Sequence, residues 1–514
     1  MSKTIIIIGA GLAGLSAALQ AAENGCNVKL VSSFPSERAQ SVMAEGGINA
    51  ALNTKDENDS PEEHFTDTIK AACGLADPNA VWGMTQAAPE LVHWLLKLGV
   101  KFNMSGYDDV DLRNFGGQKK KRTAFAQSDT GKQIMTAMID AVRRKEASGM
   151  VERFSHHSFL TLRLCDNICC GCVIRDEYSQ ETVELPGDAV IVATGGMHGL
   201  FGNTTGSLSN TGEVTAELFR LGVPLANGEM IQYHPTTVKC GGKRMLISEA
   251  ARGEGGRLFA MKDGKQWYFM EEKYPELGNL MPRDITAREI WKVSHESEVF
   301  LDMTEISDEI ISNKLSGLAD DCMTYLHKDI RKEPVSVLPG IHYFMGGILV
   351  DEQHRTPIQN LYAAGECCAQ YHGANRLGGN SLLGALYGGR VAAKSACEQA
   401  DVVDLSCATQ IDFPPASQIS EIKQLNKVMQ ETMGVVRNEN TLLNGIQTVQ
   451  ALTGNLPLLG MAVLKSALAR KESRGAHWRE DYPKSNDDDY LKTTVARFDG
   501  KQIQISFVPV PERR

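Results

Sequence analysis

The chain has 514 residues, which is too long for one ordinary hydrophobic core, so we expect two or three domains. Its composition, with 42% hydrophobic and 23% charged residues, is typical of a globular protein. The formal net charge is −10. Nucleic acid is therefore not expected as a partner, because binding phosphates requires a concentrated basic surface.

The first predicted elements form one βαβ unit: a strand from Thr4 to Ile8, a helix from Leu12 to Asn24 and a strand from Asn27 to Val31. The uncharged run from Thr4 to Ala22 is about as long as a membrane span. Three glycines and a change from β-branched to alanine-rich sequence divide this run into a strand and a helix. We therefore expect a buried βα unit and no transmembrane segment.

Gly9, Gly11 and Gly14 form the pattern G-x-G-x-x-G at the turn between this strand and this helix. The first glycine permits a tight turn, the second lets the backbone approach a pyrophosphate, and the third lets the helix pack on the strand. The helix N-terminus favours the negative charge. The acidic residue that usually binds the ribose after the second strand is missing, because Ser32 and Ser33 stand there. Hydroxyls or backbone groups are expected to hold that ribose.

Two later strand ends carry further polar and small residues. Thr194 and Gly195 follow a hydrophobic strand, although glycines at this point suit an ordinary tight turn equally well. Glu366 follows another strand, where a carboxylate can bind ribityl or ribose hydroxyls. Three such strand ends, spread over most of the chain, favour an extended cofactor such as FAD over a second substrate.

The cysteines do not predict a metal site. No secretory segment precedes the first strand, so we expect the reducing environment of the cytoplasm. The densest group, Cys165, Cys169, Cys170 and Cys172, matches no common zinc or iron–sulfur spacing. It lies in a strand–turn–strand pattern, and we expect packed free thiols there.

From about residue 234 to residue 338 the pattern becomes irregular and mixed, which suggests an inserted domain. A buried strand and a helix then return near residues 358–400, so we expect a cofactor domain built from two separated segments. Beyond residue 404 amphipathic helices are expected to about Glu472, followed by a polar tail.

Five short stretches concentrate side chains that can hold a small dianion. Arginine binds a carboxylate through two parallel hydrogen bonds, and each imidazole N–H adds one. Singly, each residue has an ordinary explanation: His234 before a proline suits a strand end, Arg283 after a proline suits a helix's first turn, and Arg252 suits a surface ion pair. Together they suit a dicarboxylate; the candidates are His234, Ser248, Glu249, Arg252, Arg283, His342 and Arg376.

In these and other stretches the chain resembles the flavoprotein subunit of succinate dehydrogenase and fumarate reductase, and more distantly L-aspartate oxidase. The resemblance runs nearly end to end, through AEGGINAALNT, RTAFAQSDTGKQ, QYHPT, SEAARGEGG, PRDITARE, HYFMGGI, AAGEC, HGANRLGGNSLL and ESRGAHWREDYP. It implies an α/β fold with a Rossmann-like FAD-binding domain in two segments, residues 1–233 and 341–404. An α+β capping domain would be inserted at 234–340, and a C-terminal helical domain with a tail would occupy 405–514.

The resemblance also implies roles for the polar candidates. Arg283 would exchange the proton at the substrate carbon, with Glu249 and Arg252 completing a relay to solvent, while the flavin passes hydride to the other olefinic carbon of fumarate. The substrate carboxylates would be held by His234, Ser248, His342 and Arg376. Glu213 stands where the family often has aspartate. The other expected FAD contacts are Gly9, Gly11, Gly14, Ser32, Gln40, Ser41, Glu45, Gly46, Gly47, Thr194, Gly195, Glu366, Ser381 and Leu382.

Gln40 lies in a stretch that contacts the isoalloxazine in this family. Many members have a histidine at or near this position that bonds covalently to the flavin 8α-methyl group. An amide is not a nucleophile of that kind, so we expect noncovalent FAD. Covalent attachment raises the flavin potential in this family, and its absence favours fumarate reduction over succinate oxidation.

Two alternative activities follow from the same resemblance. L-aspartate oxidase usually has an acid in the phrase that corresponds to RNFGGQ, where this chain has Phe115. An apolar group cannot compensate a substrate ammonium, which favours an unsubstituted dicarboxylate. A reductase of another unsaturated acid is the other alternative, because Phe344 replaces a usually small or polar residue and can reshape the cavity.

A binding or assembly module without catalysis is expected to have lost charged pocket residues, yet all of them are present. The chain has no recognisable cysteine set for a cluster of its own. An iron–sulfur subunit, free reduced flavin or another redox protein is therefore expected to deliver electrons. Partner subunits would also allow a peripheral place on the cytoplasmic membrane.

Overall fold

A computed structural model describes residues 2–107, 109–400, 413 and 418–514. At the centre of its first lobe is a parallel five-stranded sheet in the order β20-β10-β1-β2-β6. Two distant parts of the chain build this sheet, because its last strand follows the other four by some 170 residues. The strands are β1 (Thr4–Ile8), β2 (Asn27–Ser32), β6 (Val151–Ser155), β10 (Ala189–Val192) and β20 (Leu361–Ala363).

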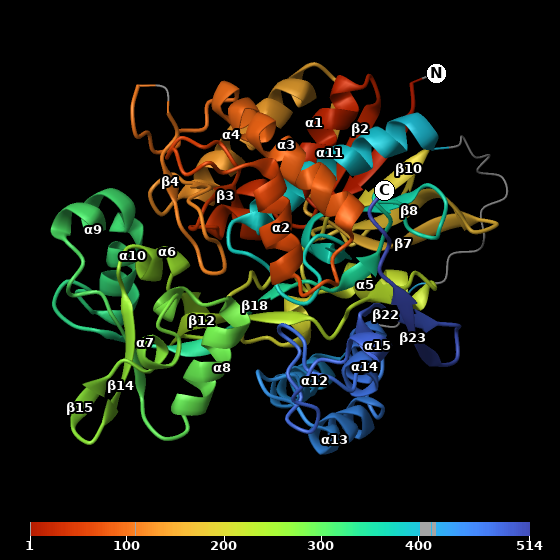
Figure 1. Ribbon diagram of the computed structural model, residues 1–514. Helices are drawn as coiled ribbons and strands as arrows, with labels where there is room; N and C mark the ends of the chain where they lie inside the picture. The colour runs from red at the N-terminus through yellow and green to blue at the C-terminus, as the bar shows by residue number, and fades with distance from the viewer. Residues whose placement is uncertain (1, 108, 401–412, 414–417) are drawn as a thin grey trace.

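Both faces of this sheet are buried, which explains the continuous isoleucine run of β1. Ile5 and Ile7 face a core shared with α1 (Leu12–Glu23) and α11 (Asn380–Gln399), two helices that pack on each other (Figure 1). Ile6 and Ile8 face a second core that includes residues of an antiparallel sheet. That sheet consists of β7 (His157–Cys165), β8 (Ile168–Asp176) and β9 (Thr182–Pro186).

The rest of the first lobe surrounds these layers. Asp77 caps α3 by accepting hydrogen bonds from the backbone N–H groups of Asn79 and Ala80. The elements are α2 (Pro61–Ala71), α3 (Pro78–Lys97), α4 (Thr130–Ala147), α5 (Glu213–Arg220) and the small sheet of β3 (Ile48–Asn49), β5 (Thr123–Ala124) and β4 (Leu112–Arg113).

Residues 231–344 form a lobe at the lower left of Figure 1 with a separate hydrophobic core. The long strands β12 (Ile231–Cys240) and β18 (Leu338–Phe344) lead into and out of this lobe. They pair with each other, and β12 also pairs with β13 (Lys243–Leu246). Its second sheet contains β14 (Arg257–Lys262), β15 (Lys265–Trp267), β16 (Val299–Asp302) and β17 (Val335–Ser336). Its helices are α6 (Glu249–Gly253), α7 (Phe269–Lys273), α8 (Arg283–Val293), α9 (Asp308–Lys314) and α10 (Ser316–Asp321).

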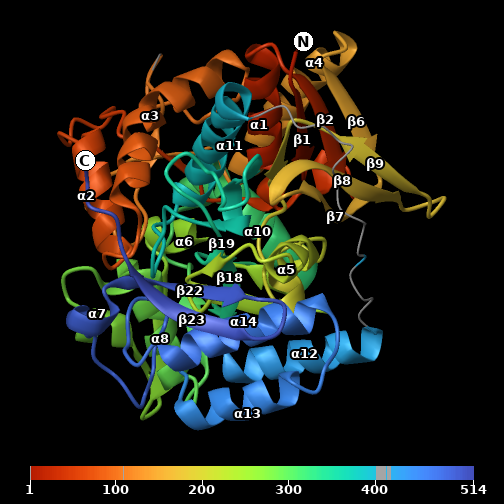
Figure 2. The same cartoon turned by 90° about the vertical axis from the view of Figure 1, so that its right-hand side faces the viewer.

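The C-terminal region is helical, as predicted, but its last segment is not a free tail. The helices are α12 (Ile419–Thr432), α13 (Glu439–Val449), α14 (Asn455–Ala469) and α15 (Asp487–Tyr490). Then β22 (Lys492–Phe498) and β23 (Ile503–Pro509) form a hairpin that extends a sheet with β11 (Leu225–Ala226), β19 (Gly347–Leu349) and β21 (Cys368–Ala369). The last residues reach α3 of the first lobe (Figure 2), where Asn79 Nδ2 donates to the carbonyl of Glu512. The predicted boundary at residue 404 lies outside the described residues.

Three of the four clustered cysteines, Cys169, Cys170 and Cys172, are buried free thiols as predicted. The prediction was wrong for Cys165, which is disulfide-bonded, because a partner outside the cluster leaves no trace in its spacing. Within the described residues no group of three or more His, Cys, Asp or Glu side chains is arranged to hold a metal ion. In that same part of the chain, no helix combines the length and apolar character needed to cross a bilayer.

Candidate active site

One cavity of about 570 Å³ lies between the first lobe and the lobe of residues 231–344. The ends of three parallel strands open into it, as the sequence predicted. Two predicted site residues, Gly14 and Arg252, do not line it. The predicted residues that do are Gly9, Gly11, Ser32, Gln40, Ser41, Glu45, Gly46, Gly47, Phe115, Thr194, Gly195, Glu213, His234, Ser248, Glu249, Arg283, His342, Glu366, Arg376, Ser381 and Leu382.

The glycine turn after β1 is as tight as its pattern predicts. Gly9 has φ +109°, and a Cβ atom built there would lie 2.2 Å from the carbonyl oxygen of Ala193. A Cβ atom on Gly14 would lie 1.9 Å from the carbonyl oxygen of Gly9. Gly14 therefore acts by letting α1 pack on the turn, whereas Gly9 and Gly11 both line the cavity.

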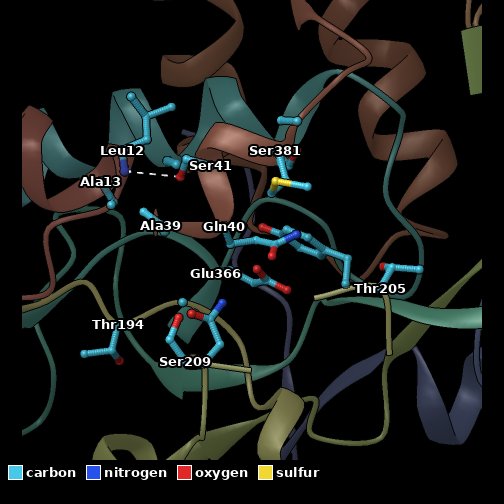
Figure 3. Close-up of a pocket in the computed structure, with 18 of the residues that line it drawn as sticks. Leu12, Ala13, Ala39, Gln40, Ser41, Thr194, Thr205, Ser209, Glu366 and Ser381 are labelled. Atoms are coloured by element: carbon cyan, nitrogen blue, oxygen red, sulfur yellow. Dashed lines mark hydrogen bonds between the residues drawn. The ribbon is translucent and has the colours of Figure 1, made fainter. Parts of the chain in front are cut away.

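Several polar groups along the first-lobe wall fit an extended dinucleotide. Leu12 N, at the start of α1, donates to Ser41 Oγ at 3.2 Å, which fixes the stretch 39–47 beside the glycine turn (Figure 3). Ser32 Oγ is buried at the end of β2 without a protein partner, and it can hydrogen-bond a ribose. Glu366 accepts a hydrogen bond from Phe344 N at 3.1 Å and keeps a second oxygen for a ligand. These polar groups, which lie at the ends of separate strands along one cavity wall, therefore fit FAD.

Gln40 begins a 3-10 turn, Gln40–Met43, and lines the same cavity as Glu366. Glu213 is the first residue of α5 and lies exposed at the rim. Glu45 is partly buried in the wall, and its Oε2 atom is enclosed without a hydrogen-bond partner. Burial, followed by the nearby charge of Asp321, raises the pKa of the Glu45 carboxyl to about 8.

Where the lobe of residues 231–344 borders the cavity, Arg283 is held by two acceptors. Its Nε and Nη2 atoms lie 2.8 and 2.6 Å from Glu249 Oε2, and its Nη1 donates to Gln232 Oε1 at 3.0 Å. Burial raises the pKa of Glu249, but the positive charges of Arg283 and Arg252 outweigh burial and lower it overall. Glu249 is therefore ionised, and it fixes the orientation of the Arg283 guanidinium.

Arg252 lies directly behind this pair. Its Nη2 atom is 3.3 Å from Glu249 Oε1, and its side chain is buried. The helix α6 brings the two residues together, because positions three apart lie on the same face. Arg283, Glu249 and Arg252 thus form a continuous buried row, which is the arrangement a proton relay requires.

Gln232 was not singled out by the sequence analysis, although it begins the stretch QYHPTT. Its Oε1 atom also accepts from Arg376 Nη2 at 3.0 Å, so one amide oxygen fixes two guanidinium groups. Arg376 also lies 4.2 Å from the centre of the Tyr343 ring, and its Nε atom has no protein partner. Burial and then the charge of Arg283 lower the pKa of Arg376 to about 9. Only the tertiary fold shows this sharing, because Gln232 and Arg376 are 144 residues apart.

The two histidines lie beside the arginines, with ring centres 5.1 Å apart. His234 Nε2 is buried without a protein partner, whereas His342 Nδ1 lies 2.8 Å from Thr205 Oγ1. Burial and the charge of Arg283 hold the pKa of both imidazoles well below its usual range. The histidines are therefore neutral, and the arginines supply the positive charge of the site. Ser248 caps α6 at the same end of the cavity.

Two phenylalanines differ in position. Phe115 is buried in the cavity wall beside Gly46. A Cβ atom built on Gly46 would lie 2.8 Å from the Cζ atom of the Phe115 ring. Phe344 does not line the cavity, in contrast to our expectation, because it packs against His198 and Phe201 behind the wall. Its neighbour Tyr343 lines the cavity instead, because a bulge at His342 in the pairing of β18 with β12 interrupts the regular alternation of side chains.

Comparison with known proteins agrees with this geometry. Residues 4–382 match a family described as FAD binding domain, and residues 452–513 match one described as fumarate reductase flavoprotein C-term. The chain is 38% identical to the succinate dehydrogenase flavoprotein subunit of Bacillus subtilis (strain 168), over 100% of this chain and 98% of that one. It is 33% identical to an L-aspartate oxidase of Pyrococcus furiosus, over 94% of this chain and 97% of that one.

A solved structure of a variant of E. coli quinol fumarate reductase FrdA has a TM-score of 0.90 with this chain, at 27% identity. The match covers 99% of this chain and 97% of that chain. The chain therefore belongs to the family of succinate dehydrogenase and fumarate reductase flavoprotein subunits, and it is an FAD-dependent oxidoreductase.

Proposed function

We propose that this chain interconverts fumarate and succinate and that it works as a fumarate reductase. The observation that carries the proposal is the buried row Arg283–Glu249–Arg252, which ends in the same cavity as the strand ends that fit FAD. No other group of the described cavity wall combines a fixed cation with a buried carboxylate behind it.

We assign substrate binding to two arginines and two histidines of the cavity wall: Arg283, Arg376, His234 and His342. A flat dianion there receives hydrogen bonds from Arg376 and from the neutral imidazoles of His234 and His342. The hydroxyl of Ser248 adds one more donor. Because these groups are already buried and oriented, they stabilise the charge that develops on a carboxylate during the reaction without further reorganisation.

Bound FAD, once reduced by its electron donor, would supply the hydride that adds to one olefinic carbon of fumarate. Arg283 gives a proton to the other carbon, so that two C–H bonds replace one C=C π bond. The proton lost by Arg283 returns from solvent through Arg252 and Glu249. A guanidinium is a poor acid in water. Proton donation by Arg283 therefore requires that the group is buried and held in a fixed position by hydrogen bonds.

The proposed direction of the reaction, from fumarate to succinate, follows from Gln40. An amide at this position cannot bond to the flavin, so FAD is held noncovalently and its potential favours reduction of fumarate. Electrons come from a redox partner of the iron–sulfur class or from a reduced flavin, and such a partner would keep the chain at a membrane surface. Phe115 supports an unsubstituted dicarboxylate over aspartate, because an apolar ring cannot pair with an ammonium.

Turnover of fumarate, succinate and L-aspartate, measured side by side with an artificial electron carrier, tests this assignment. Fumarate reduction is expected to be fastest, and L-aspartate oxidation is expected to be undetectable. Faster oxidation of aspartate than of succinate would replace the proposal with L-aspartate oxidase. Preference for a longer or branched unsaturated acid would replace it with a reductase of that acid.

A further inference from the structure

The 3-10 turn Gly278–Leu280 contacts Arg252, one arginine of the row in the site, and precedes Arg283, the other. The carbonyl oxygen of Asn279 accepts a hydrogen bond from Arg252 Nη1 at 2.5 Å. The next carbonyl, of Leu280, accepts from Gly117 N at 3.2 Å, beside the loop that carries Phe115. Arg283 follows only four residues after Asn279 and begins α8. This turn therefore binds one end of the row and precedes the other end directly in the chain.

The side chain of Asn279 fixes this turn from its outer side. Its Oδ1 atom accepts from Leu258 N on β14 at 3.0 Å, and its Nδ2 donates to Glu271 Oε1 at 3.0 Å. Both hydrogen-bonding ends of the amide are thus used, one by a strand and one by α7. Neither contact reaches the cavity, and Asn279 does not line it.

Glu271 is itself held in place. Arg257 donates from Nε and Nη2 to its two oxygens, at 2.9 and 2.7 Å, and the guanidinium lies 3.7 Å from the centre of the Tyr268 ring. The hydrogen bonds from Arg257 lower the pKa of Glu271, which stays ionised as a fixed acceptor. A paired, half-exposed carboxylate of this kind gives little net stability on its own. Its value here is that it fixes the orientation of Asn279.

We propose that Asn279 is a positioning residue for the reaction, because its side chain holds the turn whose carbonyl orients Arg252 and whose end leads into Arg283. This inference rests on the proposed function, since it concerns the return of a proton to Arg283. The substrate ligands His234, His342 and Arg376 lie on β12, β18 and the loop before α11, and none of them contacts Asn279. Loss of the amide should therefore disturb the relay and leave substrate binding intact.

The test compares Asn279→Ala with Asn313→Ala, a matched control on the exposed surface of α9 in the same lobe. With FAD bound and rates normalised to flavin content, Asn279→Ala is expected to lower kcat about tenfold or more, because a positioned acid–base group contributes at least that much. The KM for fumarate should stay within about twofold, and the solvent deuterium isotope effect on kcat should increase. A merely unstable variant would lose flavin or active fraction without a larger isotope effect.

Asn279→Asp is a second variant in case the alanine variant does not fold. It keeps the acceptor for Leu258 N but places a second carboxylate against Glu271, so its kcat should fall at least as far as that of Asn279→Ala. Crystal structures of Asn279→Ala and Asn313→Ala provide a readout that does not depend on turnover. The hydrogen bond between Arg252 and the carbonyl of residue 279 should be lost in the first and kept in the second.

The two proposals fail in different ways. If the wild type does not turn over fumarate, the proposed function is wrong, and the position of Arg252 in the crystal structures still decides the role of Asn279. If the wild type turns over fumarate and Asn279→Ala has the same kcat and isotope effect, the role of Asn279 is refuted. An unmoved Arg252 in that variant refutes it equally.

Discussion

Arg283 and Arg376 share one acceptor, the Oε1 atom of Gln232, which lies 3.0 Å from a terminal nitrogen of each. The Nε2 atom of the same amide donates to Asn375 Oδ1 and to the carbonyl of Arg376, so the amide cannot rotate without losing these bonds. A neutral oxygen orients both guanidinium groups and leaves their positive charge available to a dianion.

Replacing Gln232 with Glu should therefore weaken substrate binding. A carboxylate would accept from both arginines more strongly, but it would cancel one of the charges that attract succinate. We expect the Kd for succinate to rise about tenfold or more, which corresponds to about 1.4 kcal/mol. Titration followed by the flavin spectrum measures this. Tyr233→Phe is the control, because the Tyr233 hydroxyl donates to Met433 on the other side of the strand, and an equal effect of both variants would contradict the account.

The pH dependence of binding follows from which groups carry charge. His234 and His342 are already neutral at pH 6.5, since burial lowers their pKa, so the Kd for succinate should be flat from pH 6.5 to 8. Arg376 has a pKa of about 9, also lowered by burial, and it loses its proton above that value. Affinity should then fall about tenfold per pH unit. A steep loss of affinity between pH 6.5 and 8 would show that a histidine carries charge.

Glu45 should make the stability of the FAD-free protein fall with rising pH. Its folded pKa of about 8 lies above the ordinary value of 4.5, so the folded state keeps a proton that the unfolded state releases. The stabilisation present below pH 4.5 is lost progressively up to pH 8. Glu45→Gln should accordingly be more stable than the wild type, by an amount that increases from pH 5 to pH 8. Urea unfolding at both pH values checks this, and a constant difference would contradict it.

The flavin should be fully released by acid. Gln40 is the residue at the predicted attachment position, and under the proposed function its amide does not bond to the flavin 8α-methyl group. After acid precipitation of the purified protein, FAD absorbance should appear entirely in the supernatant, and the pellet should show no flavin fluorescence. Flavin that remains with the pellet would mean that another residue is the attachment site.

The sequence predicted the parts of the fold that depend on local pattern. The isoleucine run of β1, the glycine turn and the alanine-rich α1 are periodic and adjacent, so their βαβ unit could be predicted directly. The hairpin of β22 and β23 could not, because it pairs with β11, a strand of only two residues near position 225. A polar surface hairpin of this kind resembles a tail when its partner is far away in the chain.

In the site, too, some residues could be predicted from the sequence and others could not. Charged residues such as Arg283 and Glu249 were predicted from the sequence, and both line the cavity, although their roles remain predictions. Gln232 and Asn279 were missed because each is a neutral amide whose importance comes only from which distant groups it joins. Phe344 was misplaced because a bulge at His342 changes which side chains of β18 face the cavity, and the sequence pattern does not reveal that bulge.

The most direct test of the central claim is fumarate turnover by Arg283→Ala with its FAD content measured in the same sample. The account predicts that FAD stays bound at the wild-type ratio, since Arg283 hydrogen-bonds to Glu249 and Gln232 and to no residue assigned to FAD, while fumarate reduction falls by at least about a hundredfold. Turnover close to that of the wild type, with FAD bound, would contradict the assignment of Arg283 as the proton donor.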